Sequence, residues 1–286
     1  MRHTHTPTRR FAPPVLLTGA VLLALTGCSA VAGDDGSSPE PPTTDSRESP
    51  DSGDGNSTAP PTEQGPLSGT TIVVDPGHNG GNADAAEEIA EQVPSGPGEK
   101  SCDTVGAETA DGYHEHEFTW DLARVVRDEL ESDGAEVVLT REDNDGVGPC
   151  VNERAEIGND ADADAAVSIH ADGASGGSGF HVITPGEIDG YSTNADIIGP
   201  SRQLAEDVRT TFREEADQPY ADYIGEEGID ERTDLGGLNL STVPKVFLEV
   251  GNMRDPDDAE KITDSQWRER AGAALASGLA HYARRD

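Results

Sequence analysis

The sequence has few basic residues for its length. Twenty Lys and Arg stand against 56 Asp and Glu, which gives a formal net charge of -36 at pH 7. A chain this acidic would be repelled by nucleic acid and by other anionic phosphate surfaces, so we expect no nucleic acid among its partners. A heavily solvated acidic surface is the better explanation of the charge.

The sequence also lacks an apolar run that could span a bilayer near its N-terminus. The apolar stretch at residues 11–25 is too short and is interrupted by prolines, and it follows Arg9 and Arg10. This pattern is typical of an export signal. Its last residues, Leu25-Thr26-Gly27-Cys28, resemble a bacterial lipobox, which predicts a lipoprotein signal peptide over residues 1–28. Lipid on Cys28 would anchor the protein to the outer face of the cytoplasmic membrane; the alternative is an ordinary signal peptide with a chance cysteine.

Apolar residues are nearly absent from the segment that follows. It consists mainly of Ser, Pro, Thr, Gly and Asp, so it cannot bury enough surface to offset the entropy lost on ordering. We therefore expect a disordered tether over residues 29–67. Residues 68–286 suit one domain with its own core, without internal repeats or a second domain, and we expect a monomer.

Cysteine is scarce, with three residues in the chain. Assigning Cys28 to lipid leaves Cys102 and Cys150 as an even pair in an oxidising compartment, which predicts a disulfide. Two free buried thiols are the alternative.

Three short apolar runs each lead to a polar residue. Residues 71–74 lead through Asp75-Pro76-Gly77 to His78, residues 165–169 lead to His170, and residues 246–248 lead to Glu249. Each run is typical of a buried strand, and in open α/β sheets the ligand crevice lies beyond the carboxyl ends of the strands. We therefore predict a single α/β domain, with a mostly parallel or mixed twisted sheet of about six strands flanked by helices and a site at the C-terminal strand ends.

A helix is predicted over residues 115–132, where apolar residues follow helical spacing opposite a charged face. Extending the apolar face toward the N-terminus brings in Glu115 and His114 and excludes Glu117. Either of the first two residues can therefore point at the crevice. Further helical patterns cover residues 151–159, 200–215 and 265–284.

Two histidines and one carboxylate from separate elements are the ligand set typical of catalytic zinc, with a fourth position left for water. Each residue alone has an ordinary explanation, since a histidine after a strand is often hydrogen-bonded in a core or turn, and Glu249 could be a buried salt-bridge partner. It is improbable that all these explanations hold at once.

The chain resembles the zinc-dependent N-acetylmuramoyl-L-alanine amidases found among cell-separation and spore-lysis enzymes, over roughly residues 70–282. The matching segments are Ile72-Val73-Val74-Asp75-Pro76-Gly77-His78-Asn79-Gly80-Gly81, Glu115 with Thr119 and Leu122, Leu139-Thr140-Arg141, Glu153-Arg154-Ala155, Ser168-Ile169-His170-Ala171-Asp172 and Pro244-Lys245-Val246-Phe247-Leu248-Glu249-Val250-Gly251-Asn252. The family more often has Asn where Thr119 and Asp172 stand.

The resemblance implies that His78, Glu115 and His170 hold Zn²⁺ and that Glu249 is the catalytic carboxylate. It also implies peptidoglycan as substrate, cleaved at the amide between N-acetylmuramic acid and L-alanine, and it agrees with a structural disulfide between Cys102 and Cys150. A zinc peptidase or deacetylase acting on another wall component is an alternative that would use the same metal set. A non-catalytic peptidoglycan-binding regulator is another, but it predicts a damaged ligand set or Glu249.

Four further residues are candidates for supporting or substrate-binding roles. Asp75 either orients the second ring nitrogen of a ligand histidine or is a turn carboxylate at Pro76-Gly77. Asn79 belongs to the same motif. Arg141 and Arg154 either grip substrate carboxylates or, as we prefer, pair with acidic residues of the chain itself.

Overall fold

The computed structural model describes residues 65–285. The predicted signal peptide, the predicted lipidation site Cys28 and the predicted tether as far as residue 64 lie outside these residues. The strands are β1 (Thr71–Pro76), β2 (Gln92–Pro94), β3 (Glu99–Ser101), β4 (Glu136–Leu139), β5 (Ala165–Asp172), β6 (His181–Pro185), β7 (Ile229–Arg232) and β8 (Lys245–Asn252). The α-helices are α1 (Ala86–Ile89), α2 (Glu115–Ser132), α3 (Val151–Asp160), α4 (Ile198–Glu215), α5 (Gly236–Asn239), α6 (Pro256–Thr263) and α7 (Ser265–Ala283), and short 3-10 turns cover Asn82–Asp84 and Ala195–Ile197.

Six of the strands form one mixed sheet in the order β4-β1-β5-β8-β6-β7. The first four run parallel, β6 is antiparallel to β8, and β7 is parallel to β6. This confirms the predicted single α/β domain with a sheet of about six strands. The remaining two strands, β2 and β3, pair as a separate antiparallel hairpin.

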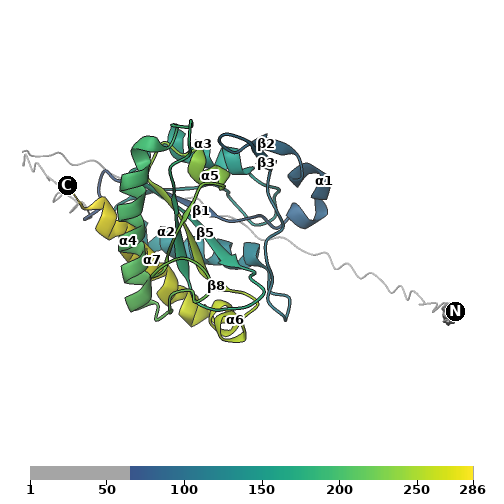
Figure 1. Ribbon diagram of the computed structural model, residues 1–286. Coiled ribbons are helices and arrows are strands. Elements are labelled where there is room, and N and C mark those ends of the chain that lie inside the picture. The colour runs from purple at the N-terminus through teal and green to yellow at the C-terminus, as the bar shows by residue number, and fades with distance from the viewer. Residues whose placement is uncertain (1–64, 286) are drawn as a thin grey trace, which may run out of the picture. The chain divides into compact units, whose positions relative to one another are not determined.

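Three helices, α2, α4 and α7, pack on one another and on one face of the sheet, while β2, β3 and α1 lie on the other side (Figure 1). The main core lies between sheet and helices, where Ile72, Val167 and Leu248 are fully buried. A smaller apolar cluster around Val73 and Ala166 lies on the opposite face. The opposite face therefore has the smaller apolar core, and short elements cover part of it.

Helix α2 forms where its apolar spacing predicted it. Phe118, Leu122, Val126 and Leu130 lie one turn apart and are buried, so a single stripe of the helix faces the sheet. The charged face remains toward solvent. This packing fixes the orientation of the first turn, which carries Glu115.

The domain begins before residue 68, where we placed its start. Leu67, which we assigned to the tether, is buried in the main core, and its N–H donates to the carbonyl of Asp133 at 2.9 Å. Burial of its apolar side chain favours packing on the domain.

Among the helices of residues 65–285, none has both the length and the apolar character needed to cross a membrane.

Candidate metal centre

The register of the central strands places His170 beside Glu249. The two residues are direct partners across β5 and β8, so their side chains leave the sheet on the same face, away from the three-helix layer. β5 continues to Asp172 and β8 continues to Asn252. His170 and Glu249 therefore lie inside the strands and not just beyond them as predicted. Both strands continue because β5 and β8 remain paired as far as Asp172 and Asn252.

His78 lies two residues beyond β1 in a left-handed conformation, with φ of +59°. The preceding Gly77 donates its N–H to the carbonyl of Ile169 at 2.9 Å, which ties this turn to β5. A Cβ on Gly77 would come within 2.3 Å of Cε1 of His170. A glycine is therefore required for the two imidazoles to approach, and their ring centroids are 5.0 Å apart.

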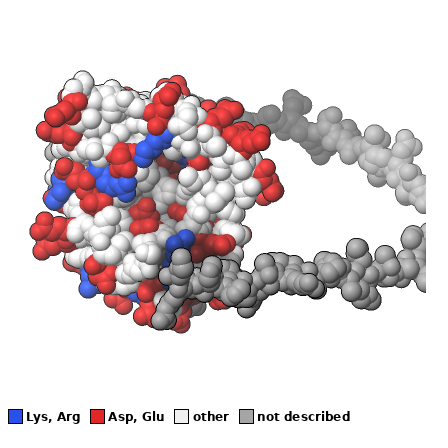
Figure 2. Space-filling model, turned by 45° about the vertical axis from the view of Figure 1, so that its right-hand side comes forward, with Lys and Arg blue, Asp and Glu red and all other residues white. Residues whose placement is uncertain are grey.

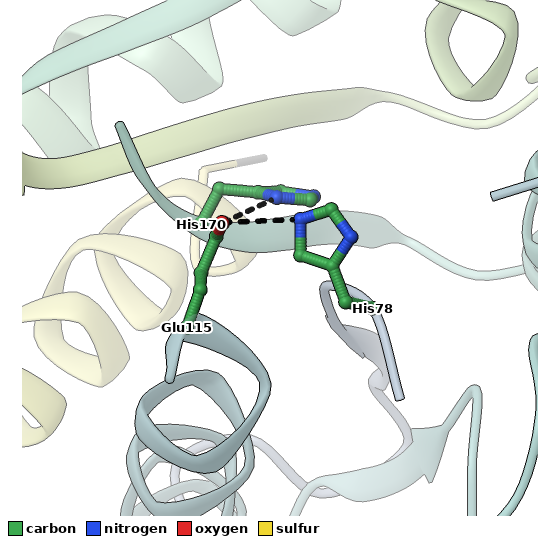
Figure 3. Close-up of side chains that lie close together, drawn as sticks. All are labelled: His78, Glu115 and His170. Carbon is green, nitrogen blue, oxygen red and sulfur yellow. Dashed lines mark hydrogen bonds and ion pairs between the residues drawn. The ribbon is translucent and has the colours of Figure 1, made fainter. Parts of the chain in front are cut away.

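The carboxylate of Glu115 lies between the two histidines (Figure 3). Oε2 is 3.2 Å from Nε2 of His78, and Oε1 is 3.0 Å from Nδ1 of His170. The same oxygens accept N–H groups from Ala107 at 2.7 Å and from Ala171 at 3.0 Å. Glu115 is thus fixed by backbone from two separate segments.

His114, the other residue that the helix pattern left open, points elsewhere. Its imidazole is about half exposed and lies 3.5 Å from Glu108. The helix thus turns the side chain of Glu115, and not that of His114, toward the crevice.

Burial and opposite charge act against each other at this cluster. Burial alone would lower the pKa of His78, but Glu115 and Asp103 raise it to about 10. Burial opposes ionisation of Glu115, yet His78 and His170 hold its pKa well below the usual range. A buried carboxylate kept ionised between two imidazoles is also the arrangement that suits a divalent cation.

The donor set fits zinc. One ligand atom from each of His78, Glu115 and His170 can be chosen so that all lie within 4.8 Å of one another. Two imidazole nitrogens and one carboxylate oxygen are the ligands of many catalytic zinc sites. The role of each residue as a ligand stays a prediction, but the structure brings the three together.

Glu249 opens into the same hollow as these residues, a cavity of about 310 Å³. Its Oε2 is buried and has no hydrogen-bond partner in the part of the chain that the structure describes. Burial, with the nearby charges of Glu115 and Asp172, raises the pKa of Glu249. Glu249 therefore lines the cavity with a carboxylate that has one buried oxygen without a partner among the described residues.

A residue that we did not predict, Asp103, contacts His78. Its Oδ1 lies 3.2 Å from Nδ1 of His78, and the carbonyl of Thr104 lies 3.1 Å from the same nitrogen. Both readings of Asp75 were wrong. Its carboxylate accepts hydrogen bonds from Arg154 at 2.8 Å and Lys245 at 3.1 Å. Side chains alternate along β1, so Asp75 lies on the sheet face opposite that of Val74, where these two cations meet it.

Arg154 pairs with acidic residues, as we preferred. It is buried, with Nη1 2.8 Å from Asp75 and Nη2 3.1 Å from Asp103. It also donates to the backbone carbonyls of Pro76 at 2.8 Å and His78 at 3.0 Å. One guanidinium thus holds the turn that carries His78.

Arg141 meets neither expectation. It is buried and donates to the carbonyls of Pro76 at 3.1 Å, Asp143 at 2.7 Å and His116 at 3.0 Å, and no carboxylate of residues 65–285 lies within salt-bridge distance. Burial, together with the charge of Arg154, lowers the pKa of Arg141 to about 9. One guanidinium thus joins the end of β1, the loop after β4 and the first turn of α2.

Asn79 likewise supports the loops instead of facing a substrate. Its Nδ2 donates to the carbonyl of Gly148 at 2.9 Å, and its Oδ1 accepts from Gly80 N at 2.8 Å. Both of its polar ends are therefore used within the protein.

The predicted disulfide between Cys102 and Cys150 is confirmed. It joins the segment after β3 to the residue that precedes α3.

A second cavity, of about 400 Å³, adjoins the first, and we call the two together the crevice. Both are lined by His78, His170 and Phe247, and the second extends to Lys100 of β3. The ring of Phe247 stacks on His170 with centroids 5.2 Å apart. Figure 2 shows one face of the molecule, mostly acidic at its rim, with basic side chains grouped beside a central hollow.

Comparisons with known proteins agree with this geometry. The family model described as N-acetylmuramoyl-L-alanine amidase matches residues 72–281. The chain is 39% identical to the N-acetylmuramoyl-L-alanine amidase Rv3717 of Mycobacterium tuberculosis over 221 residues, which cover 76% of this chain and 87% of that protein.

Two solved structures are also similar to the chain. The N-acetylmuramyl-L-alanine amidase Ami1 of Mycobacterium smegmatis has a TM-score of 0.70 at 39% identity, covering 76% of this chain and 98% of that one. The apo form of Ami1 from Mycobacterium abscessus has a TM-score of 0.70 at 40% identity, covering 76% and 99%. The chain therefore belongs to the N-acetylmuramoyl-L-alanine amidase family.

Proposed function

We propose that this protein is a zinc-dependent hydrolase that cleaves the amide between N-acetylmuramic acid and the L-alanine of the peptidoglycan stem peptide. One observation carries the proposal: Glu249 lines the same cavity as the His78, Glu115 and His170 donors. A metal-binding module without catalysis would not need this fourth group. The proposed substrate is inferred from the family to which the chain belongs.

Zinc held by His78, Glu115 and His170 would supply Lewis-acid chemistry, polarising a carbonyl and acidifying water. The side chains around it do the rest. Glu249 can accept a proton from the attacking water and deliver it to the leaving amine, because its side chain lines the cavity and its pKa is raised by burial and by Glu115. Phe247 keeps the plane of the His170 imidazole fixed by stacking.

The product distinguishes this reaction from those of a zinc peptidase or deacetylase. Purified protein incubated with peptidoglycan should release free stem peptides that begin with L-alanine, as identified by mass spectrometry. Peptides cut between amino acids, or free acetate, would instead support one of the alternative enzymes.

Glu249→Gln tests the catalytic carboxylate. We expect turnover to fall by about 10²–10⁴-fold with zinc content unchanged, since the amide keeps the shape of the side chain but cannot take the proton. Glu187→Gln, at an exposed position, is the matched control and should keep full activity. Unchanged turnover in Glu249→Gln would exclude the proposed role.

The choice of Glu115 over His114 has its own test. Glu115→Gln should lose most of its bound zinc in metal analysis, whereas His114→Ala should keep it. The reverse result would show that the wrong residue of α2 had been chosen as ligand.

We further propose that the protein acts in the cell envelope, exported through the signal at residues 1–28 and anchored by lipid on Cys28. The support is the sequence pattern of those residues. Cys28→Ala should move the protein from the membrane fraction to the medium; retention in the membrane fraction would argue against the anchor.

A further inference from the structure

We propose that Asp103 is a positioning residue for His78, and that the disulfide between Cys102 and Cys150 keeps it in place. This inference rests on the proposed zinc site. It assigns a role to a carboxylate that lies 25 residues from His78 in the sequence and to the disulfide beside it.

The two ring nitrogens of His78 have different surroundings. Nε2 faces the carboxylate of Glu115 at 3.2 Å, within the ligand cluster. Nδ1 faces Asp103 at 3.2 Å and the carbonyl of Thr104 at 3.1 Å. The carboxylate and the carbonyl can only accept, and the Thr104 hydroxyl, 3.2 Å from the same nitrogen, can accept as well as donate. The two obligate acceptors therefore favour a proton on Nδ1, which leaves the lone pair of Nε2 for a metal, and they fix the plane of the ring.

Asp103 is itself held on both oxygens. Oδ1 accepts the N–H of Thr104 at 2.7 Å, and Oδ2 accepts from Nη2 of Arg154 at 3.1 Å. The same Nη2 donates to the carbonyl of His78 at 3.0 Å. Arg154 therefore fixes the main chain of His78 and the carboxylate that orients its ring, and all three side chains are buried.

The disulfide joins the two segments that carry these groups. Cys102 directly precedes Asp103, and Cys150 directly precedes α3, whose first turn includes Arg154. The N–H of Val151 also donates to the carbonyl of Cys102 at 2.8 Å. The chain after Cys102 has no helix or strand until α2 at Glu115, so the disulfide is the covalent restraint that holds Asp103 against Arg154.

The test measures the zinc affinity of the purified protein by competition with a chromogenic chelator. Asp103→Ala should bind zinc about 10–100-fold more weakly than wild type, the usual effect of losing a group that orients a ligand. Asp103→Asn should lose less, because its amide oxygen can still accept from Nδ1. Glu99→Ala, which removes an exposed acid of β3, is the control and should bind like wild type.

A nitrogen-15 NMR spectrum of the histidine rings in the zinc-loaded protein supplies a second measurement, which a change in overall stability would not alter. Wild type and Asp103→Asn should show a slowly exchanging proton on Nδ1 of His78. In Asp103→Ala this proton should exchange faster, because only Thr104 is left to accept it. If Asp103→Ala binds zinc like wild type, or shows the same slow exchange, the positioning role is wrong. If wild type itself binds no zinc, the proposed function fails instead.

The disulfide is tested with Cys102→Ser/Cys150→Ser in both backgrounds. If it acts through Asp103, its loss should weaken zinc binding in the wild-type background and have little further effect when residue 103 is Ala. Equal losses in the two backgrounds, or no loss in either, would show that the disulfide does not act through Asp103.

Discussion

The ammonium group of Lys245, the first residue of β8, is buried. The side chain is fully buried, and its Nζ is 3.1 Å from Asp75, which also accepts from Arg154. Burial raises the pKa of Asp75, but the two cations and Thr140 outweigh it and hold that pKa far below its usual range. The carboxylate is therefore ionised throughout the physiological range, and each of the three charges depends on the others.

Lys245→Met should lower the free energy of unfolding by about 3–5 kcal/mol, the cost of removing one partner of a buried pair. Urea unfolding followed by circular dichroism measures it. Lys100→Met, which breaks only an exposed pair with Asp234, should change stability by no more than about 0.5 kcal/mol. Equal small losses in both variants would show that the buried charge contributes little.

His181 predicts an acid-dependent stability. It is buried on β6, and its Nδ1 has no hydrogen-bond partner within residues 65–285. Burial lowers its pKa from 6.5 to about 4. Between these values the unfolded chain binds a proton that the folded one does not, so stability falls as pH drops from 6.5 toward 4. The total loss is about 3 kcal/mol, since a tenfold change in proton affinity corresponds to about 1.4 kcal/mol.

His181→Gln should remove this part of the pH dependence. Urea unfolding at several pH values from 7 to 4 compares the two proteins, and carboxylates titrating in both cancel in the difference. An identical slope in the variant would mean that His181 titrates normally in the fold.

Sequence reasoning identified the side chains that meet at the metal centre but not what supports them. His78, Glu115 and His170 stand out because each follows a clear strand or helix pattern. Asp103 lies in an acidic loop in which no periodicity distinguishes one carboxylate from another. The one signal was its neighbour Cys102, because a bond to Cys150 places residue 103 near the start of the helix at residue 151.

At the scale of elements, the long regular ones were predictable and the short ones were not. Helix α2 coincides with its prediction because its buried apolar residues recur at helical spacing from Phe118 to Leu130. Strand β7 was not predicted, since its four residues include a single buried apolar side chain, Ile229, and it is a strand through its pairing with β6. Helices α5 and α6, and the β2–β3 hairpin, were also missed for want of a repeat long enough to detect.

The crossing of α4 and α7 depends on Gly278. A Cβ there would lie 2.6 Å from Oγ1 of Thr211 and 2.7 Å from Cα of Val208. Gly278→Ala should destabilise the protein by about 1–3 kcal/mol through overpacking, against a gain of about 1 kcal/mol in helix propensity, for a net loss.

Gly158→Ala in α3 is the matched control, because the added Cβ would meet only Cγ2 of Val243, at an ordinary contact distance of 3.7 Å. It should be neutral or stabilising by up to about 1 kcal/mol. Thermal unfolding of both variants measures the contrast. A stabilised Gly278→Ala would mean that the helices separate without cost.

For the whole molecule, the dominant property is its charge of -36. Self-repulsion destabilises a compact acidic chain, and salt screens it over about 10 Å at 0.1 M. Raising sodium chloride from 0.02 to 0.5 M at constant zinc should therefore raise the melting temperature, by about 2–4 °C for each kcal/mol of repulsion relieved. A melting temperature that stays flat or falls with salt would contradict this.

The bond between Cys102 and Cys150 closes a covalent ring of the chain that contains all of α2, including Glu115, while His78 and His170 lie outside it. A protease that cuts one exposed loop within the ring, such as residues 143–147, would leave two fragments still joined through sulfur. A clipped molecule would therefore migrate as one chain until it is reduced, and all three proposed metal ligands would remain on a single covalent entity.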